Sequence, residues 1–299
     1  MTQTANSFMQ AGLAALNAGD VTAAIGHFAV ARRLAPTEPG LLHSLAVLYR
    51  QERRWAEAWS VAETGLRLHP GDRNFAAARA AALGSLLLEQ GAAAEARPWL
   101  TTALDQQPDW PEMLSQAAEA AYRCHDIASA RRHMDRAVEL EPDNRSLRMA
   151  RATMLLSLGV WTPGLEDYEF RLRPEPGLEV MRNGLDAPRW QGEDMAARCL
   201  LVVAEQGIGD QIRFACDLRD LLPLCGRLIV ECEPRLAPLL ARSLPQVMIA
   251  VSRQQRAGNR HILDYGWLAD YPRIDAWIEI GSLPLRLFQR GLLPDRHRL

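Results

Sequence analysis

The chain has 299 residues, of which 48% are hydrophobic and 23% are charged, which is ordinary for a globular protein with room for two domains. A net charge of −2 and an isoelectric point near 6.4 give no basic footprint for nucleic acid. No apolar run approaches the ~20 residues of a transmembrane helix, and the N-terminal MTQTANSFMQAGLAALNAGD lacks the basic start of a signal peptide. The expected compartment is therefore cytoplasmic.

Two residue types narrow the chemistry further. All 34 basic residues are arginine, so a P-loop and the Schiff-base or pyridoxal chemistries that need a lysine amine are excluded. The cysteines form no C-x-x-C pair and have no zinc-finger spacing with histidine. They are Cys124, Cys199, Cys216, Cys225 and Cys232. We therefore expect reduced thiols, no metal site and no cofactor held by this chain.

The first half of the chain contains an internal repeat. Pro36 and Pro70 are 34 residues apart, as are Pro108 and Pro142, with four extra residues between the second and third units. Twelve and five positions before each proline stands a small residue. These residues are Ala24, Ala31, Ala58, Gly65, Ala96, Ala103, Ala130 and Ala137. Each unit predicts a helical hairpin, because small residues let two helices approach and proline ends the second helix.

This pattern resembles the tetratricopeptide repeat. The positions of that motif are filled in the first unit by Phe8, Gly12, Ala24, Phe28, Ala31 and Pro36. The expected repeats span about 5–38, 39–72, 77–110 and 111–144, with a degenerate fifth at 145–172. The resemblance implies a superhelix with a concave groove for a protein or peptide partner, and such stacks often self-associate.

Repeat register predicts which side chains point toward this groove. They are Met9, Leu13, His43, Val47, Arg50, Ser85, Glu119, Tyr122 and Arg123. For any single one of them the alternative is packing or solvation of the groove. His43 alone fits a neutral groove residue better than a ligand, and Glu119, Tyr122 and Arg123 form the best polar cluster.

From residue 198 the periodicity changes to strands alternating with helices, which predicts a parallel sheet. Strands are expected at 199–205, 227–233, 247–252 and 276–280. Helices are expected at 210–224, 234–245 and 282–291, and 261–267 is ambiguous. The fold class is thus α + α/β, with an all-α tetratricopeptide domain at 1–172, a linker at 173–197 and a single Rossmann-like lobe at 198–299.

The loop EQGIGD follows the first predicted strand of this lobe. Gly207 and Gly209 fit a dinucleotide fingerprint, but Ile212 stands where the third glycine should be. Glu231 or Glu233 could take the place of the ribose-binding acid. A nucleotide-binding Rossmann enzyme is therefore one alternative, although the motif that supports it is incomplete.

Five blocks of sequence point to a second resemblance. They are GLEDYEFR (164–171), PRWQG (188–192), EQGIGD (205–210), DAW (275–277) and SLPL (282–285). In combination they are similar to bacterial proteins that fuse tetratricopeptide repeats to a GT-B glycosyltransferase-like domain. Such domains are similar to heptosyltransferases and to protein O-linked N-acetylglucosamine transferases.

This resemblance implies roles for the loop residues. Asp210 carries over as a candidate general base for the acceptor hydroxyl, and a helix N-cap is the alternative role for its carboxylate. The expected cleft-lining residues are Glu205, Gln206, Gly207 and Gly209, and the two glycines are expected to serve a tight turn.

A GT-B enzyme has two lobes, and the second holds most of the nucleotide-sugar. Only about 100 residues follow Cys199, enough for one lobe. The first hypothesis is therefore a module that recruits a polypeptide, attached to an acceptor lobe without its donor lobe. The alternative is the N-terminal part of a glycosyltransferase acting on flagellin or another surface protein, with a nucleotide-sugar donor in a second lobe.

Overall fold

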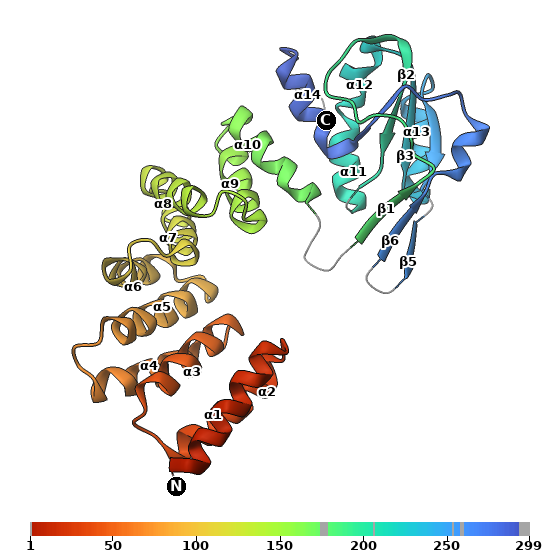
Figure 1. Ribbon diagram of the computed structural model, residues 1–299. Helices are drawn as coiled ribbons and strands as arrows, with labels where there is room; N and C mark the ends of the chain where they lie inside the picture. The colour runs from red at the N-terminus through yellow and green to blue at the C-terminus, as the bar shows by residue number, and fades with distance from the viewer. Residues whose placement is uncertain (1, 174–178, 206, 253, 258–259, 293–299) are drawn as a thin grey trace. The chain divides into compact units, whose positions relative to one another are not determined.

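The computed structural model describes residues 2–173, 179–205, 207–252, 254–257 and 260–292 (Figure 1). The chain divides into two compact units, Met1–Leu147 and Arg148–Leu299. The described part of the first unit is built from helical hairpins. Its helices are α1 (Thr2–Asn17), α2 (Val21–Leu34), α3 (Pro39–Gln51), α4 (Trp55–Leu68), α5 (Arg73–Glu89), α6 (Ala93–Gln106), α7 (Pro111–Arg123), α8 (Ile127–Leu140) and the start of α9 (Arg145–Ser157).

The helices of the first unit end where the repeat predicts. The second helix of each of the four hairpins ends two residues before its proline, at Leu34, Leu68, Gln106 and Leu140. All the small residues of the repeat pattern are buried. A Cβ placed on Gly12 would lie 2.6 Å from the Phe28 ring, so this glycine is needed for the close approach of α1 and α2.

One turn position recurs in every hairpin. Between the first and second helix the backbone is left-handed, with φ of 79° at Gly19, 84° at Gly91 and 73° at Gly159. The same position carries Arg53 (φ 56°) and His125 (φ 59°) in the other two hairpins. A residue in the left-handed conformation commonly ends a helix. Glycine adopts this conformation without the steric cost that a Cβ brings.

We expect His125→Gly to stabilise the first unit by about 1 kcal/mol, because it removes that cost at a position where three other hairpins already have glycine. The measurement is the urea midpoint of unfolding. His125→Ala keeps the Cβ and is the control, for which no gain is expected. A lower midpoint for His125→Gly than for the unchanged protein would contradict the prediction.

The second unit contains short helices and two small sheets. Its elements after α9 are α10 (Trp161–Tyr168), η1 (Glu169–Leu172), β1 (Glu179–Asn183), β2 (Met195–Val203), α11 (Ile208–Ala215), α12 (Leu218–Leu221), η2 (Leu222–Leu224), β3 (Cys225–Cys232), η3 (Pro234–Leu236), α13 (Ala237–Ser243), β4 (Met248–Val251), β5 (Gln254–Ala257), β6 (Arg260–Asp264), η4 (Gly266–Asp270), β7 (Ala276–Glu279), η5 (Ile280–Ser282) and α14 (Leu283–Gln289). The helix predicted at 210–224 is broken into α11, α12 and η2, and Pro223, which has no backbone N–H to donate, lies in the last of these.

The larger sheet is parallel throughout its described strands, in the order β4-β3-β2-β7. Alternate residues of β2 pack on opposite faces, as a strand buried on both sides requires. Leu200 and Val202 join the core that includes residues of α11–α14, whereas Leu201 and Val203 join a core with Tyr265. The predicted α + α/β class is confirmed at the level of a helical repeat region followed by a small parallel-sheet region.

The segment at 173–197, expected to be a linker, has structure of its own. Strand β1 pairs in parallel with β6, and β6 pairs antiparallel with β5, which makes a second sheet of three strands. Trp190 is fully buried, and its backbone N–H donates to the Trp277 carbonyl at 2.7 Å. Burying a side chain of this size fixes the segment on the sheet.

The fifth hairpin, α9–α10, groups with the second unit and not with the first, except for the start of α9. Asp167 on α10 is 1% exposed and accepts hydrogen bonds from Arg148 at 2.7 Å and from Arg151 at 2.5 Å, which tie α9 to α10. The Tyr168 ring lies 6.0 Å from the Phe214 ring of α11. These contacts explain why the compact division falls at 147/148, before the predicted boundary at 172.

Candidate functional site

The loop after β2 lies at the carboxyl edge of the larger sheet. Gly207 is the N-cap of α11 with φ −79° and ψ 168°, and Gly209 lies in the first turn of that helix. Neither glycine is left-handed, so neither position requires the conformational freedom of glycine. A Cβ on Gly209 would meet nothing within 4 Å, so the position is open.

Asp210 is the third residue of α11 and is half-buried. It is therefore not the N-cap: that position is Gly207, which has no side chain to cap the helix, and its carbonyl accepts the Gln211 N–H at 3.1 Å as the first helical hydrogen bond. An acid in the first turn is favoured by the helix dipole. Gln206, expected to line the cleft, lies outside the described residues.

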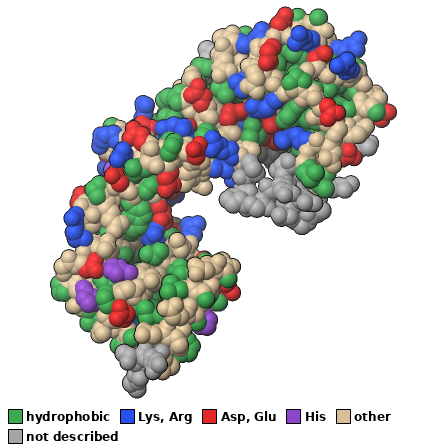
Figure 2. Space-filling view, viewed as in Figure 1, with side chains coloured by type: hydrophobic (Ala, Val, Ile, Leu, Met, Phe, Trp, Pro, Cys, Tyr) green, Lys and Arg blue, Asp and Glu red, His purple; other side chains and the backbone are tan. Residues whose placement is uncertain are grey.

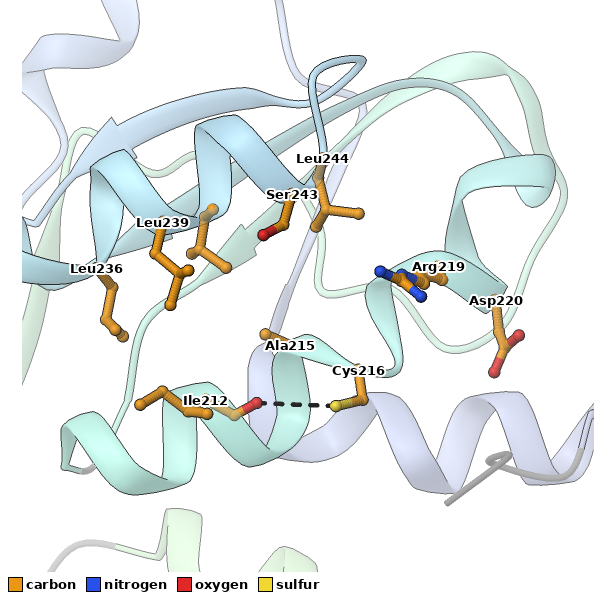
Figure 3. A pocket seen from close by; sticks show the side chains of 10 residues that line it. Ile212, Ala215, Cys216, Arg219, Asp220, Leu236, Leu239, Ser243 and Leu244 are labelled. Carbon is orange, nitrogen blue, oxygen red and sulfur yellow. Dashed lines mark hydrogen bonds between the residues drawn. The ribbon is translucent and has the colours of Figure 1, made fainter. Parts of the chain in front are cut away.

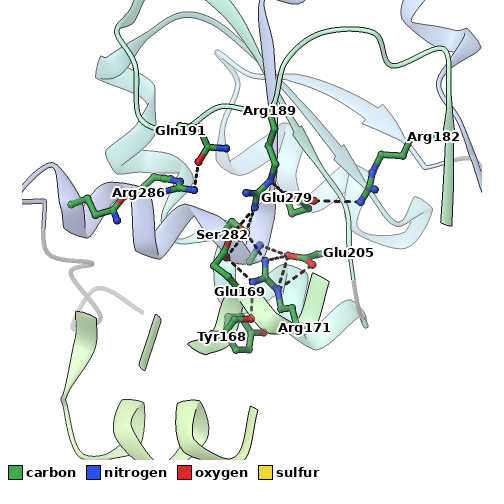
Figure 4. Close-up of polar contacts among 12 residues, drawn as sticks. Tyr168, Glu169, Arg171, Arg182, Arg189, Gln191, Glu205, Glu279, Ser282 and Arg286 are labelled. Atoms are coloured by element: carbon green, nitrogen blue, oxygen red, sulfur yellow. Dashed lines mark hydrogen bonds and ion pairs between the residues drawn. The ribbon is translucent and has the colours of Figure 1, made fainter. Parts of the chain in front are cut away.

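Glu205 is held by Arg171, which lies in η1 (Figure 4). The Arg171 side chain is 1% exposed, and its Nη2 donates to Glu205 Oε1 at 2.6 Å while Nε contacts both carboxylate oxygens at 3.2 Å. The Gly281 N–H donates to the same Oε1 at 2.8 Å. The other guanidinium nitrogen donates to the Tyr168 carbonyl and to Glu169. Glu205 is thus an anchored residue of the loop and not a free carboxylate of an open cleft.

A second arginine completes the group. Arg189 donates to Glu279 at 2.7 Å, to Glu169 at 2.8 Å and to the Ser282 hydroxyl at 3.0 Å. Ser282 in turn donates to Glu169 Oε1 at 2.6 Å and accepts from Arg171 at 2.7 Å. We call these residues the arginine–glutamate cluster: Glu169, Arg171, Arg189, Glu205, Glu279 and Ser282.

Burial and pairing set the charge states in this cluster. Burial raises the pKa of Glu205, although the Arg171 guanidinium acts in the opposite direction. Burial would also raise the pKa of Glu169, but Arg171, with hydrogen bonds from Ser282 and Arg189, holds it below its usual value. Buried carboxylates remain ionised only when they are paired in this way.

The cluster joins four of the five sequence blocks that carry the GT-B resemblance, since it takes residues from 164–171, 188–192, 205–210 and 282–285. The fifth block, 275–277, runs into strand β7 of the larger sheet. Its Asp275 carboxylate accepts the Cys199 N–H of β2 at 2.8 Å. Sequence reasoning missed these pairings. The paired residues lie far apart in the chain, so no local sequence pattern indicated these contacts.

Gly281→Ala is expected to destabilise the second unit by about 1–3 kcal/mol, because the new Cβ would lie 2.5 Å from Glu205 Oε1 and 3.0 Å from Arg171 Nη2. Gly209→Ala is the matched control, since its Cβ enters open space and alanine favours a helix. Urea denaturation of the two variants measures the effect. Equal stabilities would show that the packing around Gly281 is not tight.

Acid should weaken the cluster through Glu169. Its pKa is lowered in the fold, so its contribution is complete above its unfolded pKa of about 4.3 and is lost as the pH falls through the lower folded pKa. The stability difference between the protein and Glu169→Gln should therefore shrink as the pH falls below the unfolded pKa of about 4.3. Glu205→Gln is the comparison. Because the pKa of Glu205 is raised in the fold, its contribution to stability decreases as the pH rises. A pH-independent difference for Glu169→Gln would contradict this account.

The acids considered for ribose binding have other contacts. Glu231 is 2% exposed and accepts the Ala204 N–H at 3.0 Å, and burial raises its pKa. Glu233 accepts the Arg235 N–H at 3.1 Å and pairs with the Arg235 side chain at 2.7 Å. Nothing in these contacts favours a dinucleotide site.

The predicted groove residues lie on the first helices of the hairpins in the first unit, and we call this surface the repeat face. Leu13 and Val47 are 45% and 43% exposed, and Met9 is half-buried. His43 stacks on Phe75 with ring centroids 3.7 Å apart and pairs with Asp72 at 3.0 Å. The apolar part of the repeat face is thus open around α1 and α3.

The rest of the repeat face is polar and internally paired. Arg50 forms an ion pair with Glu112 of α7, and its side chain is 12% exposed. Arg123 pairs with Glu119 at 2.5 Å and donates to the Leu88 carbonyl at 3.3 Å. Tyr122 is half-buried. Ser85 was predicted to face the groove, and this is wrong. Its side chain is 3% exposed and donates to Gln116 at 2.5 Å, so it packs α5 against α7.

Acidic and basic side chains are interspersed on the face shown in Figure 2. Among the described residues, no group of three His, Cys, Asp or Glu side chains could hold a metal ion. None of the described helices is long and apolar enough to cross a membrane.

Comparison with known proteins supports the repeat assignment. Residues 87–154 match the protein-family profile described as Tetratricopeptide repeat. With the helix pattern above, this makes the first unit a tetratricopeptide-repeat module, a fold used for protein interaction. Protein FlbA of Caulobacter vibrioides is 30% identical over 262 residues, which are 86% of this chain and 43% of FlbA. The chain therefore spans less than half the length of this relative.

Several solved structures are similar in part. TTC0263, a thermophilic tetratricopeptide-repeat protein of Thermus thermophilus, is 21% identical with a TM-score of 0.45 over 57% of this chain and 92% of that chain. MamA of Desulfovibrio magneticus RS-1 is 16% identical with a TM-score of 0.44 over 55% of this chain and 91% of that chain. PilF of Pseudomonas aeruginosa is 19% identical with a TM-score of 0.43 over 56% of this chain and 75% of that chain.

Proposed function

We propose that the protein recruits a polypeptide on the repeat face, and that its α/β unit corresponds to the acceptor-side lobe of a GT-B glycosyltransferase. The observation that carries the first part is the combination of a tetratricopeptide-repeat module with exposed apolar side chains at Leu13 and Val47. Exposed apolar side chains that lie on one repeat surface suit the apolar face of a partner segment.

The α/β part of the proposal rests on the sequence blocks that resemble GT-B proteins. Four of them meet in the arginine–glutamate cluster, which anchors the loop before Asp210 at the carboxyl edge of a parallel sheet. Ligands of open α/β sheets bind beyond this edge. Glu205, held by Arg171 and the Gly281 N–H, supports the start of this region, close in sequence to the carboxylate proposed to face an acceptor.

Two versions of the proposal differ in their chemistry. In the first, the protein binds its partner without catalysis. In the second, the chain works with a further lobe that holds a nucleotide-sugar, and Asp210 takes the acceptor hydroxyl proton. The acceptor oxygen then bonds to the anomeric carbon, and the nucleoside diphosphate leaves with the electrons of the broken bond. A surface protein such as flagellin is the acceptor that the resemblance suggests.

Peptide binding tests the recruiting role. An array covering surface proteins of the source organism is probed with the intact protein and with a Tyr122→Ala, Arg123→Ala double variant. We expect the variant to lose about tenfold or more in affinity, because it removes an aromatic and an arginine contact. Trp59→Ala is the control, since Trp59 is 39% exposed on α4, the second helix of its hairpin. Equal binding by all three proteins would overturn the recruiting role.

Sugar transfer separates the two versions. The chain is incubated with nucleotide-sugars and a bound peptide, and the peptide mass is measured. Transfer that disappears in Asp210→Asn supports the second version. Binding without transfer supports the first, and transfer that persists in Asp210→Asn removes Asp210 as the base.

A further inference from the structure

Arg286 of α14 lies beside the arginine–glutamate cluster without a carboxylate partner of its own. In Figure 4 its side chain points toward Gln191, on one side of the cluster. The glutamates of the cluster are matched in number by the arginines that pair with them. These residues are Glu169, Glu205, Glu279, Arg171, Arg182 and Arg189. Arg286 is therefore a positive charge in excess of these pairs, and among the described residues it forms no ion pair.

The contacts of Arg286 leave its charge uncompensated. The side chain is half-buried, its Nη1 donates to the Gln289 amide oxygen at 3.0 Å and its Nη2 donates to the Gln191 amide oxygen. Its Nε is buried without an acceptor in the described part of the chain. Burial lowers the pKa of Arg286; Glu169 acts against this effect and Arg189 adds to it. Because a guanidinium stays charged in proteins, Arg286 is a partly buried cation whose described partners are neutral amides.

Arg290 brings a second guanidinium to the same short segment of chain. Its Nη1 donates to the Gly192 carbonyl at 2.7 Å and lies 3.4 Å from the Glu193 carbonyl. Arg286 and Arg290 are four residues apart, so they are neighbours at the end of α14, and like charges at this spacing repel each other. Glu193 is the acid of this segment, and its carboxylate accepts the Gln191 N–H at 2.8 Å. Two arginines thus reach a segment that has one acid.

This segment lies at the edge of the larger sheet where ligands are expected. The chain before Gln191 runs parallel to β7, since the Trp190 N–H donates to the Trp277 carbonyl at 2.7 Å. Gln191 therefore follows at the carboxyl edge, beyond which open α/β sheets bind ligands. By contrast, the hollow between α11 and α13 is lined mainly by apolar side chains, and its charged lining residues, Arg219 and Asp220, have opposite signs (Figure 3).

We propose that Arg286 and Arg290 bind the phosphate group of a small molecule, with the Gln191 and Gln289 amides as further donors. An oxyanion between the two guanidinium groups removes their repulsion and gives Arg286 the counter-ion that it lacks. A phosphate has more acceptor oxygens than a carboxylate, which suits a site with two guanidinium groups and two amides. The proposal goes beyond the proposed function, because it requires neither the repeat face nor sugar transfer.

The test measures binding of inorganic phosphate and of uridine diphosphate to the full chain by phosphorus NMR at low salt. We expect phosphate to bind with a Kd of about 10 mM or lower, and acetate to compete for the site about tenfold more weakly or worse. The affinity should fall as sodium chloride is raised. Tighter binding of uridine diphosphate than of phosphate supports a nucleotide as the ligand, and equal binding supports recognition of the phosphate group alone.

Variants locate the binding. Arg286→Gln and Arg290→Gln are each expected to weaken phosphate binding by about tenfold or more, and Arg286→Lys should weaken it less because it keeps the charge. Arg242→Gln removes an exposed arginine of α13 and is the matched control, which should bind phosphate normally.

Urea unfolding shows whether each variant is folded, and Arg290→Gln, at an exposed residue, keeps the test decisive if Arg286→Gln is not. No phosphate binding below about 10 mM, acetate bound as tightly as phosphate, or unchanged binding by Arg290→Gln would each overturn the proposal. The peptide array and the sugar-transfer measurement use other residues, so a negative result there leaves this site unaffected.

Discussion

Replacing Arg171 with leucine is expected to destabilise the second unit by about 3–5 kcal/mol. Arg171 is nearly inaccessible to solvent, and it contacts Glu205, Glu169 and Ser282 at once. Without the guanidinium, Glu205 keeps the Gly281 N–H as its described donor and becomes a buried charge without a counter-ion. Removing one partner of a buried pair costs far more than the pair contributes as a whole.

Hydrogen exchange with mass spectrometry measures this effect locally, because β2 and β7 should lose protection most. Arg235→Leu is the matched control, since Arg235 also pairs with a glutamate but its side chain is 76% exposed, and exposed pairs contribute about 0–1 kcal/mol. Adding Glu205→Gln to Arg171→Leu should restore part of the loss by removing the stranded charge. Similar costs for Arg171→Leu and Arg235→Leu would show that the cluster is no more than a surface network.

Phe75→Ala should destabilise the first unit by about 3–5 kcal/mol. The Phe75 side chain is fully buried, stacks on His43 at 3.7 Å and packs so closely on Gly65 that no Cβ fits there. Alanine leaves a cavity between α4 and α5. The neighbouring helices cannot close this cavity without moving the repeat face.

The measurement is urea unfolding, with exchange protection read in α3–α5. Trp59→Ala removes a larger aromatic that is 39% exposed, and its cost should stay well below that of Phe75→Ala. A loss of protection confined to the second unit, or equal costs for the two variants, would contradict the assigned core.

Much of the first unit follows from sequence because the same packing recurs along the chain. A proline two residues after a helix and buried alanines at fixed offsets act locally, so position in the repeat predicts the environment. The burial of Ser85 was not predicted, because its side chain contacts Gln116 in the next repeat. The left-handed Arg53 and His125 are visible only once the glycine positions of the other hairpins are aligned with them.

The second unit was predictable in part. Apolar runs predict β2, β3, β4 and β7, the four strands of the larger sheet, and the signal is clearest for the inner strands β2 and β3, which each end in five buried residues. Strand β1 has a polar, short sequence, and its partner β6 begins at Arg260, far along the chain, so no local pattern indicates the pairing. The arginine–glutamate cluster was invisible for the same reason: its contacts join residues 34, 90 and 111 positions apart.

The repeat face as a polypeptide-binding surface is the central claim, and site-specific photo-crosslinking in the source cells tests it most directly. A photoreactive residue is placed at Val47 on the repeat face, at Tyr122 on the same face, or at Trp59 on α4. We predict one shared polypeptide adduct from Val47 and Tyr122, reduced by the Arg123→Ala substitution, and none of that mass from Trp59. Adducts that are absent from Val47 and Tyr122, or that form equally from Trp59, would contradict the account.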